Sequence, residues 1–395
     1  MTTIEDVFDL IRNGVSIKQH PEKSGFPITR IETISNRVVD RTRMGYAGIT
    51  DISKYKDYIL QDEDILMSHI NSIQHLGKAA IYKKIGNEKI IHGMNLLCLR
   101  PKKDKIHSSF ALYYFLSDDF HRKIASITKP SVNQASFTIS ALKKLSFPSF
   151  SISEQQKIAS KFDAIGQIVV LREQQLSKLD QLVKSRFIEM FGKIESNSSS
   201  WNMVKLNQVI KSCEAGWSGS GIQRQKQENE VAVLKVSSVT KGYFDFHEYK
   251  VLNDQKNIKK YIYPQKNDLI FSRANTRELV GATAIIDKDY PKFILPDKLW
   301  RIKLNNNINI YYIKYILSDN FYRKKISSIS TGTSGSMFNV SMEKFKSLDL
   351  PLPPLPLQEQ FAEFVQQVDE VKSPVKQSLE KLETLKKSLM QEYFG

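Results

Sequence analysis

The sequence has little of what several classes of protein require. It contains two cysteines, Cys98 and Cys213, which are too few for a disulfide framework and have no metal-ligand spacing. Its longest apolar runs, such as residues 168–171, are far too short to cross a bilayer. Its first ten residues lack the charged-then-apolar pattern of a signal peptide. We therefore expect a cytoplasmic protein with reduced thiols.

Motifs that would carry catalysis are also missing. The sequence has no Gly-rich loop ending in Lys-Ser or Lys-Thr and no Asn/Asp-Pro-Pro-Tyr methyltransferase motif. Its seven histidines have no metal-ligand spacing. The Gly-rich stretch 216–221 lacks a clear strand-then-helix context, so we interpret it as a DNA-facing loop rather than a nucleotide site. Residues 369–372, Asp-Glu-Val-Lys, are faintly similar to a nuclease cluster, but they lie in a helical pattern and favour a solvated helix face.

What the sequence has in excess is positive charge. The formal net charge over 395 residues is +16. A strong positive balance predicts a polyanionic partner, usually nucleic acid.

The chain is an internal repeat of about 200 residues. Residues 64–68, Asp-Ile-Leu-Met-Ser, match 268–272, Asp-Leu-Ile-Phe-Ser, and in the same alignment Asn71 meets Asn275 and Gly77 meets Gly281. Further matches pair residues 114–120 with 315–321 and residues 176–192 with 379–395. Each half has a mixed strand and helix pattern, then a Pro-containing connector, then a long helical stretch.

Both helical stretches have apolar residues at three- and four-residue steps, from Ile158 to Met190 and from Phe361 to Leu389. A helix of about 40 residues would be roughly 60 Å long. That is too long to bury against one small domain, so we expect the two helices to pack on each other, antiparallel and coiled-coil-like. The alternative is that each helix packs only on its own domain.

The ends and interruptions of these helices also carry signals. Ser153-Glu154-Gln155-Gln156 fits a capping box in which Ser153 is the cap and Gln156 reaches back. Gly192 is a plausible helix stop. Ser373-Pro374 predicts a kink or a helix restart.

Charge by segment suggests a division of labour. The net charge is +7 in residues 1–148, +1 in 149–197, +10 in 198–353 and −2 in 354–395. Phosphate contacts need basic side chains, so the two globular segments are the expected DNA-binding parts and the helices the spacer and protein-contact surface. We therefore predict an α+β protein with recognition domains at 1–148 and 198–353, separated by helical regions at 149–197 and 354–395 in a pseudo-twofold repeat.

This plan resembles the specificity (S) subunits of type I restriction-modification systems over the whole chain. The most specific local marks are the Pro-rich connector leading to residues 357–360, Leu-Gln-Glu-Gln, the loop 331–336 and the segment 271–275. The first half departs from the pattern. It has 153–156 without a preceding Pro-Leu, and it has residues 127–133 where the second half has its Gly-Ser loop.

The resemblance implies that each recognition domain reads one half of a split DNA target and that the helices set the distance between the halves. It implies two modification (methyltransferase) subunits, which carry S-adenosylmethionine, and restriction (translocase and nuclease) subunits, which use ATP and Mg²⁺. This chain itself is expected to bind no cofactor or metal and to have no catalytic residues.

Arginine can make two hydrogen bonds to guanine and asparagine two to adenine, and small residues allow close approach to a phosphate or groove. On these grounds we expect DNA contacts from Arg273, Asn275, Arg277, Thr331, Gly332, Thr333, Ser334, Gly335 and Ser336, and in the first half from His69, Asn71, Lys129, Ser131 and Asn133. Two other functions stay open: a stand-alone bilobed DNA-binding regulator, and a catalytic fusion with nuclease or methyltransferase activity, against which the missing motifs weigh.

Overall fold

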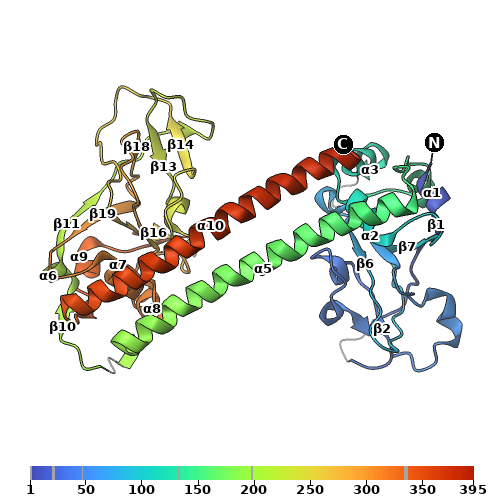
Figure 1. The fold of residues 1–395 in the computed structure, drawn as a ribbon, viewed down its shortest axis with the longest axis horizontal. Helices are drawn as coiled ribbons and strands as arrows, with labels where there is room; N and C mark the ends of the chain where they lie inside the picture. Colours follow the sequence, from blue (N-terminus) through green and yellow to red (C-terminus); the bar gives the residue numbers. More distant parts are fainter. Residues whose placement is uncertain (1, 20–22, 47, 131–133, 197–198, 333–336) are drawn as a thin grey trace. The chain divides into compact units, whose positions relative to one another are not determined.

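The computed structural model describes residues 2–19, 23–46, 48–130, 134–196, 199–332 and 337–395. The chain divides into two compact units (Figure 1). Unit 1 consists of Met1–Glu173 and Lys376–Gly395, and unit 2 consists of Gln174–Val375. Each of the two long helices therefore contributes one part to each unit. None of the helices in the described ranges is long and apolar enough to cross a membrane.

Unit 1 is built on a four-stranded antiparallel sheet. Its strand order is β1 (Phe8–Asn13), β7 (Leu96–Pro101), β4 (Ile65–Ser68) and β6 (Ala79–Ile81). Its helices are α1 (Ile4–Val7), α2 (Ser108–Phe115), α3 (Asp118–Ile127), α4 (Ile139–Lys143), the first part of α5 (Ile152–Phe191) and the last part of α10 (Leu355–Phe394). Two small sheets pair β2 (Pro27–Ile28) with β3 (Gly45–Tyr46), and β5 (Ile70–Asn71) with β9 (Ala135–Ser136) and β8 (Lys129–Pro130). Four 3-10 helices complete the unit: η1 (Ile31–Ile34), η2 (Arg41–Arg43), η3 (Ser53–Tyr58) and η4 (Ile73–His75).

Unit 2 repeats this plan and adds a second sheet. Its main sheet has the order β11 (Ile210–Ala215), β19 (Leu299–Leu304), β15 (Leu269–Ser272) and β17 (Thr283–Ile285). Its helices are the last part of α5, α6 (Leu206–Val209), α7 (Ile310–Ser318), α8 (Asn320–Ile329), α9 (Met342–Lys346) and the first part of α10, with η5 (Ile194–Ser196) and η6 (Val236–Val239). Short pairs join β10 (Met203–Lys205) to β21 (Asp349–Pro351) and β16 (Ala274–Asn275) to β20 (Phe338–Asn339). The added sheet has the order β12 (Gly221–Ile222), β14 (Tyr249–Leu252), β13 (Ala232–Leu234) and β18 (Phe293–Ile294).

The central strand of each main sheet is buried on both faces. In β15, Leu269 and Phe271 face the helical layer, while Ile270 belongs to a separate cluster under the added sheet. In β4, Ile65 and Met67 likewise pack with the helices. Burial on both faces explains why these strands are continuously apolar rather than alternating. The mixed helix and strand composition predicted from the sequence is confirmed.

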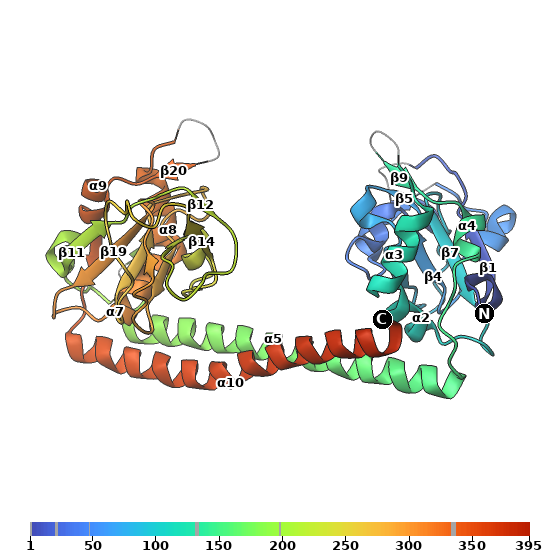
Figure 2. The same cartoon turned by 90° about the horizontal axis from the view of Figure 1, so that it is seen from above.

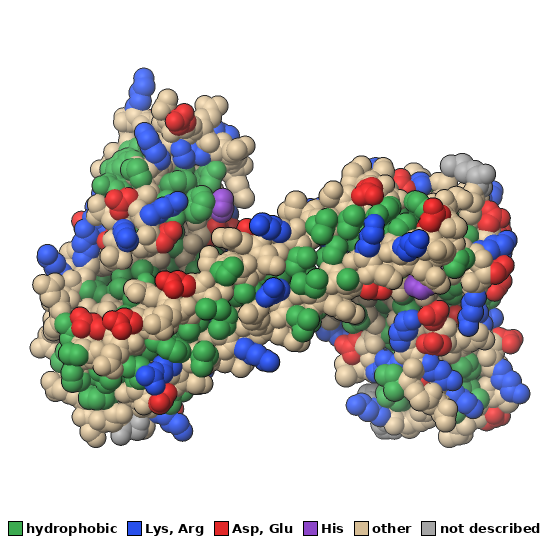
Figure 3. All heavy atoms as spheres, viewed as in Figure 1, with side chains coloured by type: hydrophobic (Ala, Val, Ile, Leu, Met, Phe, Trp, Pro, Cys, Tyr) green, Lys and Arg blue, Asp and Glu red, His purple; other side chains and the backbone are tan. Residues whose placement is uncertain are grey.

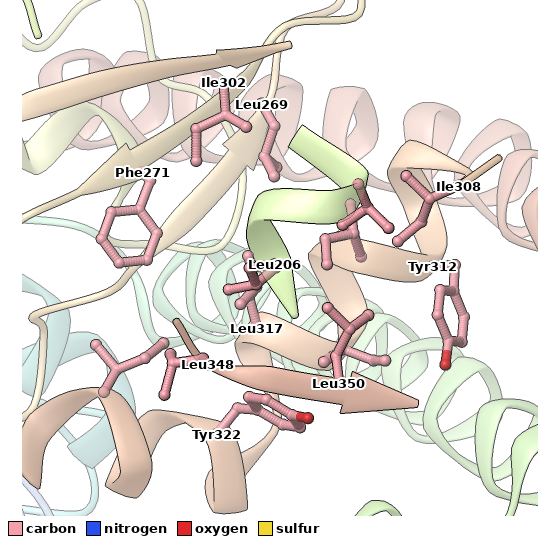
Figure 4. Packing of buried hydrophobic residues seen from close by; sticks show 14 of the residues in the cluster. Leu206, Leu269, Phe271, Ile302, Ile308, Tyr312, Leu317, Tyr322, Leu348 and Leu350 are labelled. Carbon is pink, nitrogen blue, oxygen red and sulfur yellow. The ribbon is translucent and has the colours of Figure 1, made fainter. Parts of the chain in front are cut away.

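The core of unit 2 joins the sheet to its helices (Figure 4). Phe271 stacks on Trp300 with ring centroids 5.4 Å apart. The hydroxyls of two buried tyrosines are satisfied by backbone carbonyls: Tyr312 donates to Pro351 at 2.7 Å and Tyr322 donates to Asp349 at 2.6 Å. These bonds fix α7 and α8 to the segment that leads into α10.

Two matched glycines show why the repeat preserves certain residues. Gly77 and Gly281 follow the central strands and have φ values of +73° and +83°. A β-carbon at Gly281 would lie 2.8 Å from a side-chain carbon of Ile326, and one at Gly77 would lie 3.2 Å from the Phe120 ring. Both the left-handed backbone and the helix packed against it favour glycine at this turn.

The start of α5 differs in detail from the sequence prediction. Ser151, not Ser153, caps the helix: its hydroxyl accepts from the Glu154 amide at 3.3 Å, and the Glu154 carboxylate accepts from the Ser151 amide at 2.8 Å. Gln155 is buried, and its side-chain amide donates to the carbonyls of Phe150 and Lys105. The capping box is present but begins two residues earlier than predicted.

The rest of both helices follows the apolar pattern. Each contains 40 residues. α5 ends at Phe191, and Gly192 follows with φ +79° and donates to the Ile188 carbonyl at 2.8 Å, which confirms the predicted stop. α10 continues through Pro374, so the predicted restart does not occur.

The helices contact each other within each unit. In unit 2, Asp180 accepts from Lys372 at 2.6 Å, Arg186 lies over the Phe364 ring, and Phe187 meets Phe361, so the two helices run in opposite directions there. In unit 1, the Lys161 ammonium donates to the Tyr393 hydroxyl at 2.7 Å, and Phe162 stacks on Phe394. Residues 369–371 are exposed on α10, in agreement with the predicted solvated helix face, whereas Lys372 is buried by the pairing in unit 2.

Candidate nucleic-acid interface

In unit 2 the structure brings two predicted segments together in one small antiparallel sheet. Strand β16 pairs antiparallel with β20, with Ala274 opposite Asn339. Thr331 then exchanges two backbone hydrogen bonds with Asn339, both of 2.8 Å. The segment around Arg273–Arg277 and the base of the loop from Thr331 therefore lie side by side, although they are far apart in the sequence.

Arg273 lies between β15 and β16 and is 30% exposed. Its backbone amide donates to the Lys298 carbonyl at 3.0 Å, and its carbonyl accepts from the Val340 amide at 2.9 Å. Its Nε donates to the Asp297 carbonyl oxygen at 2.9 Å. The arginine is thus held by its main chain and by its side chain, with part of the guanidinium open to solvent.

Asn275 ends β16, and Arg277 lies in the turn that follows. The Asn275 side-chain oxygen accepts from the Thr276 amide at 2.9 Å, so one of its two base-reading groups is used in a local turn. Arg277 is exposed and lies over the Phe338 ring, 5.4 Å from its centroid. Arg277 therefore places a cation directly over β20.

The base of the Gly-Ser loop is closely packed. Thr331 and Gly332 are exposed, and a β-carbon at Gly332 would lie 2.4 Å from the Met337 carbonyl oxygen. Any larger residue at Gly332 would push the two sides of the loop apart. The predicted contacts Thr333, Ser334, Gly335 and Ser336 lie outside the described residues.

Unit 1 has a corresponding small sheet. Strand β5 pairs with β9, with Asn71 opposite Ala135, and β9 also pairs with β8, with Lys129 opposite Ser136. The Asn71 side-chain oxygen accepts from the Ser72 amide at 2.8 Å, as in unit 2. Lys129 is exposed. The predicted contacts Ser131 and Asn133 lie outside the described residues.

His69 takes the sequence position of Arg273 but not its environment. It is 7% exposed and meets the Phe137 ring edge-on at 6.3 Å. Its Nδ1 is buried with no hydrogen-bond partner among the described residues, and burial lowers the pKa of the imidazole. In this structure the His69 side chain belongs to the interior, and its contact with DNA stays a prediction.

Each small sheet lies on the side of its own unit that is away from the long helices. In Figure 2, β20 lies away from α5 and α10 within unit 2, and β5 and β9 lie away from α2 and the C-terminal end of α10 within unit 1. The long helices therefore do not cover the small sheet in either unit.

The added sheet of unit 2 carries much of that unit's exposed positive charge. Figure 3 shows Lys and Arg side chains spread among apolar ones over the lobe with β13, β14 and β18. Lys256 and Lys259 are exposed, whereas the Lys260 ammonium donates to the Ala215 carbonyl at 2.7 Å. Lys259 is therefore the better placed of the two neighbouring lysines for a phosphate.

Sequence reasoning missed Asp297, which contacts Arg273, and Ser218, which exchanges hydrogen bonds with Asp297. Asp297 is 24 residues from Arg273 in the sequence, so no local pattern could reveal the contact. Within the described ranges, no group of three or more His, Cys, Asp or Glu residues is placed to hold a metal ion.

Comparisons with known proteins place this fold in a family. The model of the type I restriction modification DNA specificity domain matches residues 1–181 and 198–384. The chain is similar to the putative MjaX specificity subunit of Methanocaldococcus jannaschii, with 30% identity over 98% of this chain and 90% of that protein. It is also similar to the EcoKI specificity subunit of Escherichia coli K12, with 23% identity over 99% of this chain and 87% of that protein. The chain belongs to the type I restriction-modification specificity family, as the resemblance predicted.

Solved structures agree at the level of the fold. The S subunit of the type I restriction-modification system from M. genitalium aligns with a TM-score of 0.57 and 13% identity, over 100% of this chain and 95% of that chain. A chain from a structure on complex assembly and conformational transition of the type I system aligns with a TM-score of 0.50 and 14% identity, over 98% of both chains.

Proposed function

We propose that this chain recognises a bipartite DNA target and is the scaffold of a type I restriction-modification complex. Residues 1–148 and 198–353 would each read one half of the target. The helical regions 149–197 and 354–395 would form an antiparallel, coiled-coil-like spacer related by a pseudo-twofold axis. The single observation that carries the proposal is the small antiparallel sheet that follows an inner strand of the main sheet in both units, built with different side chains.

The different side chains of the two small sheets support separate reading of two half-sites. The same antiparallel strand pairing occurs in both units, between β5 and β9 in unit 1 and between β16 and β20 in unit 2. Position 273 is a part-exposed arginine, whereas the matching position 69 is a buried histidine. A shared backbone with different side chains at its surface is what two readers of different half-sites require.

The partners follow from the family. A repeated scaffold offers two equivalent faces, so two copies of one modification subunit can dock on it. Those subunits would carry S-adenosylmethionine, and restriction subunits would bring ATP and Mg²⁺. This chain would contribute DNA recognition and assembly, with no cofactor and no catalytic group of its own.

Exchange of one recognition domain tests this proposal. Residues 1–148 are replaced by the corresponding domain of another family member, and methylated sites are mapped across the host genome. We expect one half of the methylated target to change and the other half to stay. The reciprocal exchange of residues 198–353 is the matched control and should change only the other half. A change of both halves after either exchange would contradict independent reading.

Lys259→Ala should weaken binding to target and random DNA alike. A phosphate contact carries no base information, so we expect the slope of log K against log salt to fall by about 1. The measurement is DNA affinity of the assembled complex at several salt concentrations. Lys381→Ala, which removes the same charge from an exposed position on α10, is the control and should leave the slope unchanged. Equal slopes for wild type and Lys259→Ala would remove Lys259 from the interface.

A further inference from the structure

The guanidinium of Arg273 is held by one residue, Asp297. Its Nε donates to the Asp297 carbonyl oxygen at 2.9 Å, and its Nη2 lies 3.7 Å from the Asp297 carboxylate. Asp297 therefore contacts the inner edge of the guanidinium through both its backbone and its side chain. An arginine side chain normally has many rotamers, and this double contact restricts them before any ligand arrives.

Asp297 is itself fixed by Ser218. The Ser218 hydroxyl donates to the Asp297 carboxylate, and the Asp297 amide donates to the Ser218 oxygen at 3.2 Å. The carboxylate thus has one oxygen toward Ser218 and the other toward Arg273. A chain of contacts runs from Ser218 through Asp297 to Arg273.

The Gly-rich stretch 216–221 brings Ser218 to this position. The Trp217 amide donates to the Leu295 carbonyl at 2.9 Å, and a β-carbon at Gly216 would lie 1.9 Å from that same oxygen. Only glycine allows the two segments to approach so closely. The stretch that looked like a loop for a nucleotide or for DNA is therefore packed against the turn that carries Asp297.

The outer edge of the guanidinium is left open. Among the described residues, Nη1 of Arg273 has no hydrogen-bond partner, and the side chain is 30% exposed. The free N–H groups match the two acceptors, N7 and O6, that guanine presents in the major groove. A guanidinium that is already held in one orientation loses less conformational entropy when it binds these two guanine acceptors than a freely rotating side chain does.

We propose that Asp297, fixed by Ser218, is a positioning residue that orients Arg273 to read a guanine in the half-site bound by unit 2. This inference rests on the proposed function of DNA recognition. The described residues of unit 1 show no equivalent contact. Met94 takes the place of Asp297 in the strand pairing. Asp297 lies two residues before Leu299, which pairs with Ser272. Met94 likewise lies two residues before Leu96, which pairs with Ser68. The two units therefore read this position by different means.

The test compares Arg273→Ala, Asp297→Asn and the double variant in the assembled complex with its methyltransferase subunits. The probes are a duplex carrying the methylated target mapped in the host, the same duplex with each guanine of the unit 2 half-site replaced in turn, and a random duplex. Asp297→Asn keeps the backbone acceptor and removes only the carboxylate. Glu228→Gln removes one acidic charge from the same unit, at an exposed side chain without a described partner, and is the matched control.

We expect Arg273→Ala to lower the ratio of target to random affinity about 10-fold or more and to abolish the preference at one guanine. Asp297→Asn should lower the same ratio several-fold at that same guanine, and the double variant should lose no more than Arg273→Ala alone. Glu228→Gln should leave the ratio unchanged. Circular dichroism of each variant checks that the fold is intact, and Ser218→Ala, which keeps both charged groups, should give a smaller loss at the same guanine.

The outcomes separate two kinds of failure. If Arg273→Ala lowers the ratio but Asp297→Asn and Ser218→Ala do not, the positioning role is overturned while DNA recognition stands. If the losses of Arg273→Ala and Asp297→Asn add in the double variant, Asp297 acts independently of Arg273 and the inference also fails. If the wild-type complex shows no preference for the mapped target, the proposed function itself is wrong.

Discussion

Phe361→Ala is expected to lower the free energy of unfolding of unit 2 by about 3–5 kcal/mol. Phe361 is fully buried, and its ring meets those of Phe187, Phe191 and Tyr315 at centroid distances of 5.2, 5.5 and 5.1 Å. These rings come from α5, α7 and α10, so the truncation leaves a cavity at the point where the domain joins both long helices. Such a cavity costs both the lost burial and the lost packing.

Tryptophan fluorescence during urea unfolding measures this change in one unit alone. All three tryptophans of the chain, Trp201, Trp217 and Trp300, lie in unit 2. Phe364→Ala is the matched control, because Phe364 is only partly buried on the same helix and should lose much less stability. A loss below about 1 kcal/mol for Phe361→Ala would mean that the helices do not depend on this contact.

Gln358→Ala should destabilise unit 2 by about 2–4 kcal/mol, because it leaves a buried carbonyl and a partly buried amide without partners. The Gln358 side-chain oxygen accepts from the Asn309 amide at 2.8 Å, and its nitrogen donates to the Pro353 carbonyl at 2.8 Å. The residue therefore ties the first turn of α10 to the start of α7 and to the connector. The small apolar alanine can replace neither bond.

The same fluorescence measurement applies to Gln358→Ala, with the exposed neighbour Gln360→Ala as the control. Gln155 makes the matching bonds in unit 1, where it accepts from the His107 amide at 2.9 Å. Gln155→Ala should therefore leave the tryptophan transition in place while it destabilises unit 1, as followed by hydrogen exchange. Equal stability of Gln358→Ala and Gln360→Ala would show that water replaces the lost bonds.

The helices and the repeat could be predicted because they depend on spacing alone. Apolar residues at helical steps predicted the long helices, and glycine at 192 predicted the end of α5. The cap was misplaced because two patterns overlap: Ser151 with Glu154, and Ser153 with Gln156. The structure uses the first, since Gln155 must turn inward to bond the connector and α2.

The candidate site was less accessible to sequence reasoning, for a physical reason. Alignment of the two halves placed His69 at the position of Arg273. The alignment could not show that the His69 side chain is buried whereas the Arg273 side chain is partly exposed. Phe137 covers His69, and Asp297 holds Arg273, and both partners are distant in sequence. Which side chains cover or orient a given residue depends on tertiary contacts that a local pattern does not contain.

Unit 1 is formed by two segments that are far apart in the sequence, so it cannot be completed until the second segment has been synthesised. Phe394 is buried among Phe110, Tyr114 and Phe162 of unit 1. The segment Lys376–Gly395 is translated about 200 residues after Glu173, which at roughly 5–20 residues per second is a delay of about 10–40 s. During that time the apolar face of α5 in unit 1 lacks the segment of α10 that packs on it, so this face stays exposed on the nascent domain.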